Sequence, residues 1–221
     1  KELAPGIYGM VAGDANADGV VDGIDHTDQI VPGKVNVLNI WREGVDLNFG
    51  ANDPIIGKYA IKSFVAATKA LKENQIDVLV TAPINKYNIQ SEEFKFPGHT
   101  DYLDKELEGN ALMLMVQDNL RVGLLTDHIP VNDVAEHLTE KLIIQKIETI
   151  KQSLIQDFGI RKPKIAVLGI NPHNGDHGVI GNEDDTILRP ALDEIYKKGT
   201  LVYGPYAADS FFGSGNYEKF D

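Results

Sequence analysis

Helical and extended patterns alternate along the sequence from about Gly57 onward, and this alternation constrains the fold more than any other feature. Apolar residues recur at helical spacing around 61–71, 142–158 and 184–198, which predicts three amphipathic helices. Short apolar runs predict strands at 76–81, 111–116, 120–126, 164–170 and 201–203. Strands that alternate with helices favour a largely parallel sheet covered on both faces. We therefore predict a doubly wound α/β fold.

The first fifty residues differ from the rest, because they are rich in Gly and Asp and show little sustained periodicity. We therefore predict an atypical N-terminal segment, residues 1–50, followed by an α/β region, residues 51–221.

Composition excludes several classes of protein. The formal net charge is −12, from 33 acidic and 21 basic residues, and the sequence shows no basic stripe of the kind that nucleic-acid binding needs. No apolar run approaches the roughly 20 residues that span a bilayer. The sequence has no cysteine, which removes disulfides and thiolate zinc sites and fits a reducing compartment. We expect a cytoplasmic protein that binds neither nucleic acid nor membrane.

Polar loops follow four of the predicted strands, at 81–86, 126–130, 171–176 and 204–209. Ligands of open parallel sheets bind outside the carboxyl ends of the strands, so these loops are the candidate site. Two of them carry a histidine, His128 and His173. Two neutral imidazoles suit a divalent metal such as zinc, manganese or cobalt, with a third ligand from this chain or a partner. The alternative is that each histidine is a hydrogen-bonded loop residue.

A second candidate site lies in the long connection between Thr81 and Ala111. Gly98 is followed by His99 and Thr100, which places backbone N–H groups, an imidazole and a hydroxyl together. Such a group can hold a phosphate or a carboxylate. A turn with a threonine helix cap explains the same residues equally well. Lys86 is either a point-charge phosphate contact or a solvated lysine.

At these same residues the chain resembles the 4-hydroxythreonine-4-phosphate dehydrogenase family, over roughly residues 57–221. Six motifs appear in order and carry the resemblance: Thr-Ala-Pro-Ile-Asn-Lys at 81–86, Phe-Pro-Gly-His-Thr-Asp-Tyr-Leu at 96–103, Thr-Asp-His-Ile-Pro at 126–130, Gly-Ile-Asn-Pro-His-Asn-Gly-Asp at 169–176, Gly-Asn-Glu at 181–183 with Ile187 and Pro190, and Gly-Pro-Tyr-Ala-Ala-Asp at 204–209.

The resemblance implies an isopropylmalate-dehydrogenase-like fold and a homodimer with its active site between domains and subunits. It also implies NAD-dependent oxidation of the C3 hydroxyl of 4-phosphooxy-L-threonine, a small phosphorylated amino acid. The β-keto acid so formed loses carbon dioxide and gives 3-amino-2-oxopropyl phosphate, in vitamin B6 biosynthesis. By the match, His99 and Thr100 bind substrate, and His128 and His173 are two of three ligands of zinc, magnesium, cobalt or manganese. The metal acts as a Lewis acid.

Two parts of the family pattern are missing from the sequence. The N-terminal glycine-rich strand and loop is absent, and so is the region that would follow Asp221, with the third histidine ligand in a Tyr-His-Asp-Gln-Gly motif and most cofactor contacts. We therefore expect an incomplete member of the family, whose chain begins at Lys1 without a signal-peptide pattern.

Residues 14–25 carry a motif foreign to that family. The segment has the spacing of an EF-hand calcium loop and resembles a dockerin-type loop, with Gly19 at its sixth position. Its candidate calcium ligands are Asp14, Asn16, Asp18, Val20 through its carbonyl, Asp22 and Asp25. The alternative is a turn rich in Gly and Asp that matches by coincidence.

Three functions remain open from the sequence alone. The first is the dehydrogenase. The second is a non-catalytic scaffold or binding module stabilised by calcium. The third is a metal-dependent phosphate-ester hydrolase that uses His128 and His173.

Overall fold

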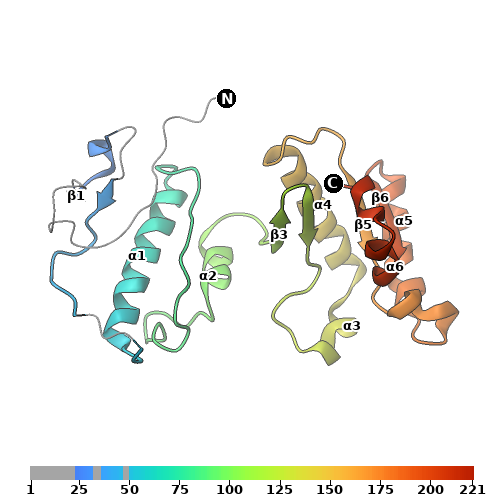
Figure 1. Ribbon diagram of the computed structural model, residues 1–221, viewed down its shortest axis with the longest axis horizontal. Coiled ribbons are helices and arrows are strands. Elements are labelled where there is room, and N and C mark those ends of the chain that lie inside the picture. The colour runs from blue at the N-terminus through green and yellow to red at the C-terminus, as the bar shows by residue number, and fades with distance from the viewer. Residues whose placement is uncertain (1–22, 32–35, 47–49) are drawn as a thin grey trace. The chain divides into compact units, whose positions relative to one another are not determined.

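The computed structural model describes residues 23–31, 36–46 and 50–221, and the chain divides into two compact units, Lys1–Ala111 and Leu112–Asp221 (Figure 1). Each unit is described by itself. Among the helices of the described ranges, none combines the length and the apolar composition that crossing a membrane requires.

The first unit is built around one long helix. Asp53 caps its start by accepting a hydrogen bond from the Ile55 N–H at 2.9 Å, and Pro54 occupies the first helical position, where its missing N–H costs nothing. The helix predicted around 61–71 is thereby confirmed and begins earlier. The elements of this unit are β1 (Gly23–Ile24), the 3₁₀ turn η1 (Thr27–Gln29), β2 (Val37–Leu38), α1 (Pro54–Lys72) and α2 (His99–Glu106), with β1 and β2 paired in parallel.

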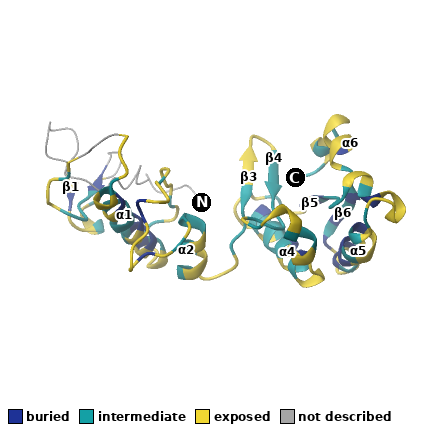
Figure 2. Cartoon of the chain, turned by 90° about the horizontal axis from the view of Figure 1, so that it is seen from below, coloured by how far each residue is buried: buried dark blue, intermediate teal, exposed yellow. Residues whose placement is uncertain are grey.

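An aromatic cluster forms the core of the first unit. Phe64 of α1 packs against Tyr102 of α2 with ring centroids 5.1 Å apart, and Phe94 lies 5.3 Å from both Phe96 and Tyr102. Figure 2 shows buried residues on one side of α1 and exposed residues on the other. Polar Thr68 belongs to the buried side, where its hydroxyl donates to the Phe64 carbonyl at 2.9 Å.

The strand predicted at 76–81 is wrong. Its residues pair with no strand among those that the structure describes, and Val78 and Val80 are 71% and 89% exposed. An extended segment becomes a strand only beside a partner whose backbone groups it can bond. Here the segment contributes only Leu79 to the aromatic cluster.

Most of the helices and strands that the structure describes belong to the second unit. Its strands and helices are β3 (Leu114–Gln117), β4 (Leu120–Gly123), α3 (Val134–His137), α4 (Glu140–Gln156), β5 (Lys164–Leu168), α5 (Arg189–Lys197), β6 (Leu201–Tyr206) and α6 (Ala208–Gly213). Its shorter turns are η2 (Val131–Asp133), η3 (Pro172–Gly178), the π turn η4 (Asp184–Leu188) and η5 (Asn216–Lys219).

The α/β character of the fold is confirmed, whereas a single wound sheet is not. The described strands pair only two by two, and β5 and β6 run parallel, with Lys164 opposite Leu201. β3 and β4 form an antiparallel hairpin. Only Asp118 and Asn119 separate these two strands, and a connection that short cannot bring a chain back to run parallel.

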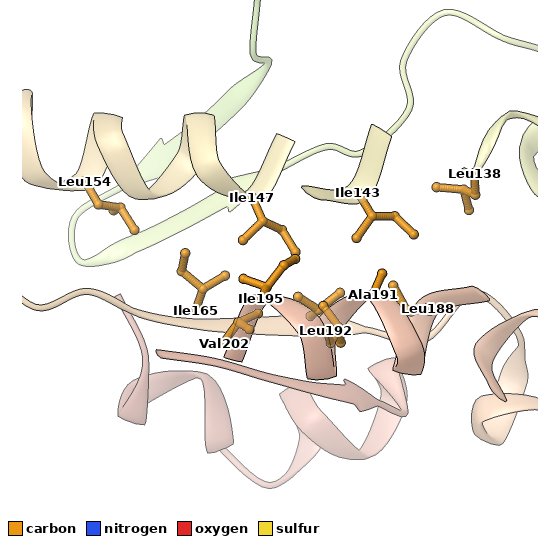
Figure 3. Close-up of a cluster of buried hydrophobic side chains, with 11 residues drawn as sticks. Leu138, Ile143, Ile147, Leu154, Ile165, Leu188, Ala191, Leu192, Ile195 and Val202 are labelled. Atoms are coloured by element: carbon orange, nitrogen blue, oxygen red, sulfur yellow. The ribbon is translucent and has the colours of Figure 1, made fainter. Parts of the chain in front are cut away.

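The core of the second unit lies between α4 and the β5–β6 pair. Ile143, Ile147 and Leu154 project from α4 onto β5, β6 and α5, and all three are at most 2% exposed (Figure 3). Full burial of each such side chain stabilises the fold by about 1.5–3 kcal/mol. The helix predicted at 142–158 is confirmed, and the one predicted at 184–198 begins as a π turn.

Candidate functional site

The loop that follows β5 has an unusual backbone. Five consecutive residues, His173 to His177, have φ angles of 52°, 55°, 77°, 45° and 55°, all in the left-handed region. Four of them are Asn, Asp or His, the residues other than glycine that adopt this region most often. His173 therefore sits in a left-handed turn and is exposed.

A buried carboxylate holds the start of this loop. Asp184, in the π turn η4, is 0% exposed. Its Oδ1 accepts the N–H of Ile170 at 2.7 Å, and its Oδ2 accepts the N–H of Asn171 at 2.9 Å. The carboxylate thus fixes the backbone just after β5, two residues before His173.

Two asparagine side chains extend the anchoring. Asn171 Nδ2 donates to Glu183 Oε2 at 2.8 Å and to Asp184 Oδ2 at 3.2 Å. Hydrogen bonds from the Glu183 backbone and then from the Asn171 side chain lower the pKa of Glu183. Asn174 Nδ2 donates to the carbonyl of Pro205 at 3.1 Å, which ties the turn to β6. We call Asn171, Asn174, Glu183 and Asp184 the polar anchor.

Gly169 makes room for the polar anchor. A Cβ at this position would collide with Asn174 Oδ1 and would lie 3.1 Å from Asp184 Oδ1. Any larger residue at the end of β5 would therefore push the anchor aside.

His128 lies in the loop that follows β4. It too has a left-handed backbone, with φ of 48°, and it is exposed. The neighbouring residues Asp127 and Ile129 line a hollow of about 460 Å³, together with His137 and Lys141. His137 is engaged elsewhere, because its Nδ1 lies 2.8 Å from the Asp133 carbonyl.

The two predicted metal ligands therefore share a setting. Each is exposed, left-handed and placed after a strand of the second unit. An imidazole pair is the donor chemistry that zinc, cobalt and manganese accept. Residues 23–31, 36–46 and 50–221 contain no group of three His, Cys, Asp or Glu side chains that could hold a metal ion. The shared metal site therefore stays a prediction.

The predicted substrate residues of the first unit lie close together. His99 and Thr100 begin α2, where unpaired backbone N–H groups favour an anion. A Cβ on Gly98 would lie 3.9 Å from the Cε of Lys86, so the lysine side chain passes beside this turn.

His99 is also part of the aromatic cluster. Its ring meets Phe64 edge-on, with centroids 4.7 Å apart, and burial lowers its pKa. Burial therefore favours the neutral imidazole, whose single ring N–H can donate a hydrogen bond.

Two polar side chains shape the segment that carries Lys86. Asn85 Oδ1 accepts the N–H groups of Tyr87 and Asn88, at 3.0 and 3.1 Å. Gln90 Nε2 donates to the carbonyls of Lys86 and Phe96, at 3.2 and 3.0 Å. Sequence reasoning missed Gln90, Asn171 and Asp184. Asn85 alone carried a usable signal, since asparagine often caps a turn two residues on.

The second unit also contains an apolar cavity of about 410 Å³. Residues of β4, α4 and β5 line it, and so do Phe211 and Phe220. None of His128, His173 and the polar anchor lines this cavity, although Gly169 and Ile170, which contact the anchor, do.

The calcium hypothesis gains no support. Residues 14–22 lie outside the described residues, and of the six predicted ligands only Asp25 can be placed. Arg42 Nη2 donates to its carboxylate at 2.7 Å and lowers its pKa. The carboxylate of Asp25 thus already has a cationic partner.

Comparison with known proteins gives a consistent result. Residues 9–221 match the family model described as pyridoxal phosphate biosynthetic protein PdxA. A 4-hydroxythreonine-4-phosphate dehydrogenase of Bacteroides thetaiotaomicron is 48% identical over 190 residues, which are 85% of this chain and 52% of that protein. The same-named protein of Sulfurihydrogenibium sp. is 36% identical, over 90% of this chain and 61% of its own.

Solved structures agree with these matches. The crystal structure of a 4-hydroxythreonine-4-phosphate dehydrogenase from Burkholderia phymatum superposes with a TM-score of 0.75 at 30% identity. The superposition covers 91% of this chain and 62% of the Burkholderia phymatum chain. The chain therefore spans only about half to three-fifths of the length of the relatives that it matches.

Proposed function

The chain belongs to the PdxA family of pyridoxal phosphate biosynthetic proteins, and from that membership we propose that it serves as a 4-hydroxythreonine-4-phosphate dehydrogenase. The proposed reaction is the NAD-dependent oxidation of 4-phosphooxy-L-threonine at its C3 hydroxyl, followed by loss of carbon dioxide. The product is 3-amino-2-oxopropyl phosphate. The proposal includes a homodimer that works in the cytoplasm, in keeping with a sequence that has no cysteine.

One observation supports the proposal most directly. Lys86 passes beside the turn at Gly98 that begins α2, so a cation, a hydroxyl and free helix N–H groups come together. This combination suits a phosphate monoester. Thr100 donates its hydroxyl to the phosphate, and the neutral His99 donates one ring N–H.

The second unit supplies the metal ligands in this proposal. His128 and His173 would hold a divalent cation such as zinc or manganese through their imidazole nitrogens. When bound, the metal would supply Lewis-acid polarisation of the substrate oxygen, and NAD would accept the hydride. The chain's own contribution is to orient both imidazoles, through the left-handed loops that follow β4 and β5. We assign no described residue to the nucleotide.

Calorimetry with 4-phosphooxy-L-threonine tests the phosphate site without requiring turnover. Replacing His99 with alanine removes one hydrogen bond to a charged group, which contributes about 1.5–3 kcal/mol. We therefore expect the substrate Kd of His99→Ala to rise by about 10-fold or more. His177→Ala is the matched control, because His177 is exposed and lies outside this unit.

Turnover is measured in parallel, as formation of reduced nicotinamide and release of inorganic phosphate. Reduction of NAD without phosphate release supports the dehydrogenase. Phosphate release without NAD reduction would instead establish the hydrolase that the two histidines also suit. A wild-type protein that neither binds nor converts 4-phosphooxy-L-threonine would contradict the proposal.

A further inference from the structure

We propose that Asp184 is a positioning residue for metal binding. Through the polar anchor, it holds the backbone at His173 in the conformation that places this histidine for a metal ion. The proposal rests on the proposed function of His173 as a metal ligand. It adds a residue that touches neither metal nor substrate and acts through the polar anchor.

The first argument is the burial of a charge without a counter-ion. Asp184 is 0% exposed, and among the described residues it forms no ion pair. A buried carboxylate is costly unless hydrogen-bond donors compensate its charge. Its hydrogen-bond donors belong to two consecutive residues and are the N–H groups of Ile170 and Asn171 and the Asn171 amide.

The direction of these hydrogen bonds separates positioning from simple helix capping. A carboxylate at a helix start commonly accepts N–H groups of its own first turn. Asp184 stands at such a start, yet both of its oxygens accept from the segment just after β5, 13 and 14 residues away in sequence. The carboxylate of Asp184 therefore binds the loop that carries His173 and does not cap its own helix.

The second argument is the strained backbone that follows. A non-glycine residue in the left-handed region persists only where its surroundings over-determine it. His173 has a φ of 52°, and it is flanked by fixed points on both sides. Asp184 holds Asn171 before it, and the Pro205 carbonyl holds Asn174 after it.

At Gly169 the polar anchor leaves no room for a side chain. The absence of a side chain there lets Asn174 and Asp184 approach the end of β5 together. Asn174 and Asp184, which fix the backbone on either side of His173, thus both lie against Gly169. A ligand histidine held in this way keeps its backbone conformation, and with it the direction of its Cα–Cβ bond, before any metal arrives.

The test is the affinity of the purified protein for Mn²⁺ and Co²⁺, measured by calorimetry, with the Co²⁺ absorption spectrum as a report on ligand geometry. In Asp184→Asn one oxygen becomes an NH₂ group that faces a backbone N–H, so at least one of the two hydrogen bonds from the backbone is lost. We expect the metal Kd to rise 10- to 100-fold, the range typical for residues that orient a ligand. We also expect an altered Co²⁺ spectrum.

Asp185→Asn is the matched control. Asp185 is the next residue along the chain, is exposed and pairs with Arg189 at 3.2 Å. We expect its Kd and Co²⁺ spectrum to equal those of the wild type. Should Asp184→Asn fail to fold, Asn171→Ala replaces it, because that variant keeps the carboxylate and removes only the side-chain bonds. Its Kd should rise several-fold.

A readout without metal separates this proposal from the proposed function. NMR of the metal-free protein reports amide exchange at Ile170 and Asn171 and the ring signals of His173. Faster exchange and shifted ring signals in Asp184→Asn, with Asp185→Asn unchanged, support the positioning role. Unchanged ring signals in Asp184→Asn would overturn it. A wild-type protein that binds no metal would instead remove the role of His173, and this proposal with it.

Discussion

Two loops carry the predicted site residues, and they are held in different ways. The loop 81–98 of the first unit is packed by its own aromatic side chains, with Phe94 2% exposed. The loop 169–184 of the second unit contains no aromatic residue and is fixed by a buried carboxylate and two amides. Apolar packing tolerates small shifts, whereas hydrogen bonds fix direction. The second arrangement suits a residue whose ring orientation matters.

The largest effect should come from the aromatic loop. Phe94→Ala removes a buried ring that touches Phe96 and Tyr102, which should lower the free energy of unfolding by about 3–5 kcal/mol. Urea denaturation followed by fluorescence measures it. Tyr87→Ala in the same loop is the control, since Tyr87 is 74% exposed and its loss should change stability by less than about 0.5 kcal/mol. Equal effects would show that the ring cluster does not hold the loop.

The polar loop should respond to volume instead. Gly169→Ala forces a methyl group against Asn174 and Asp184, and overpacking of this kind costs about 1–3 kcal/mol. Thermal melting detects the loss, and the metal Kd should rise with it. Gly213→Ala, whose added Cβ would meet no other atom within 4 Å, should stabilise α6 slightly. A Gly169→Ala protein as stable as the wild type would mean that the polar anchor moves aside freely.

A smaller effect should follow from the Gln90 amide, which joins two parts of the aromatic loop. Gln90→Ala loses the hydrogen bonds to the Lys86 and Phe96 carbonyls, each of which contributes about 0.5–1.5 kcal/mol or less at the surface. Binding of 4-phosphooxy-L-threonine should weaken more than stability does, because Lys86 loses its support. Gln152→Ala, which removes one exposed bond to Glu148, should leave that binding unchanged. Parallel losses of binding in both variants would contradict a specific role for Gln90.

The smallest effect is the response to pH. Burial lowers the pKa of His99 below its usual 6.5, so its stability contribution is fully present above pH 6.5 and declines as the pH falls below it. Hydrogen bonds lower the pKa of Glu183 below 4.5, so its contribution is lost only as the pH falls below that value.

Amide exchange measured from pH 7.5 down to pH 4 should therefore show the aromatic loop loosening before the polar loop. His99→Asn should delay the loosening of the aromatic loop, and His177→Asn should not. Simultaneous loosening of both loops in the wild-type protein would contradict the assignment.

The same contrast explains what the sequence could predict. The stripe of Ile143, Ile147 and Leu154 predicts α4 because helical periodicity is a local property. The apolar run at 76–81 predicts a strand that the structure does not contain, because a strand requires a partner that its own residues do not specify. The apolar runs predict β3 and β4 in nearly the right places, whereas the prediction of a largely parallel sheet fails for this pair, which is antiparallel.

The site residues also fall into two groups, those with a local sequence signal and those without one. His99, His128 and His173 stand beside proline, glycine or strand ends, so local pattern identified them. Asp184 looks like any acidic residue at a helix start, and only the folded chain brings it to Ile170 and Asn171. Residues that act across a dozen positions of sequence leave no periodic signal.

The left-handed turn at 173–177 has a consequence for protein engineering. Each non-glycine residue there costs about 1–2 kcal/mol in backbone energy, more than the roughly 0.5–1 kcal/mol of entropy that glycine loses on folding. Asp176→Gly and His177→Gly should therefore raise the melting temperature, because both side chains are exposed. His173→Gly should raise it as well and abolish metal binding. A laboratory-evolution screen for heat resistance would thus favour glycine at position 173, while a screen for metal uptake would retain histidine.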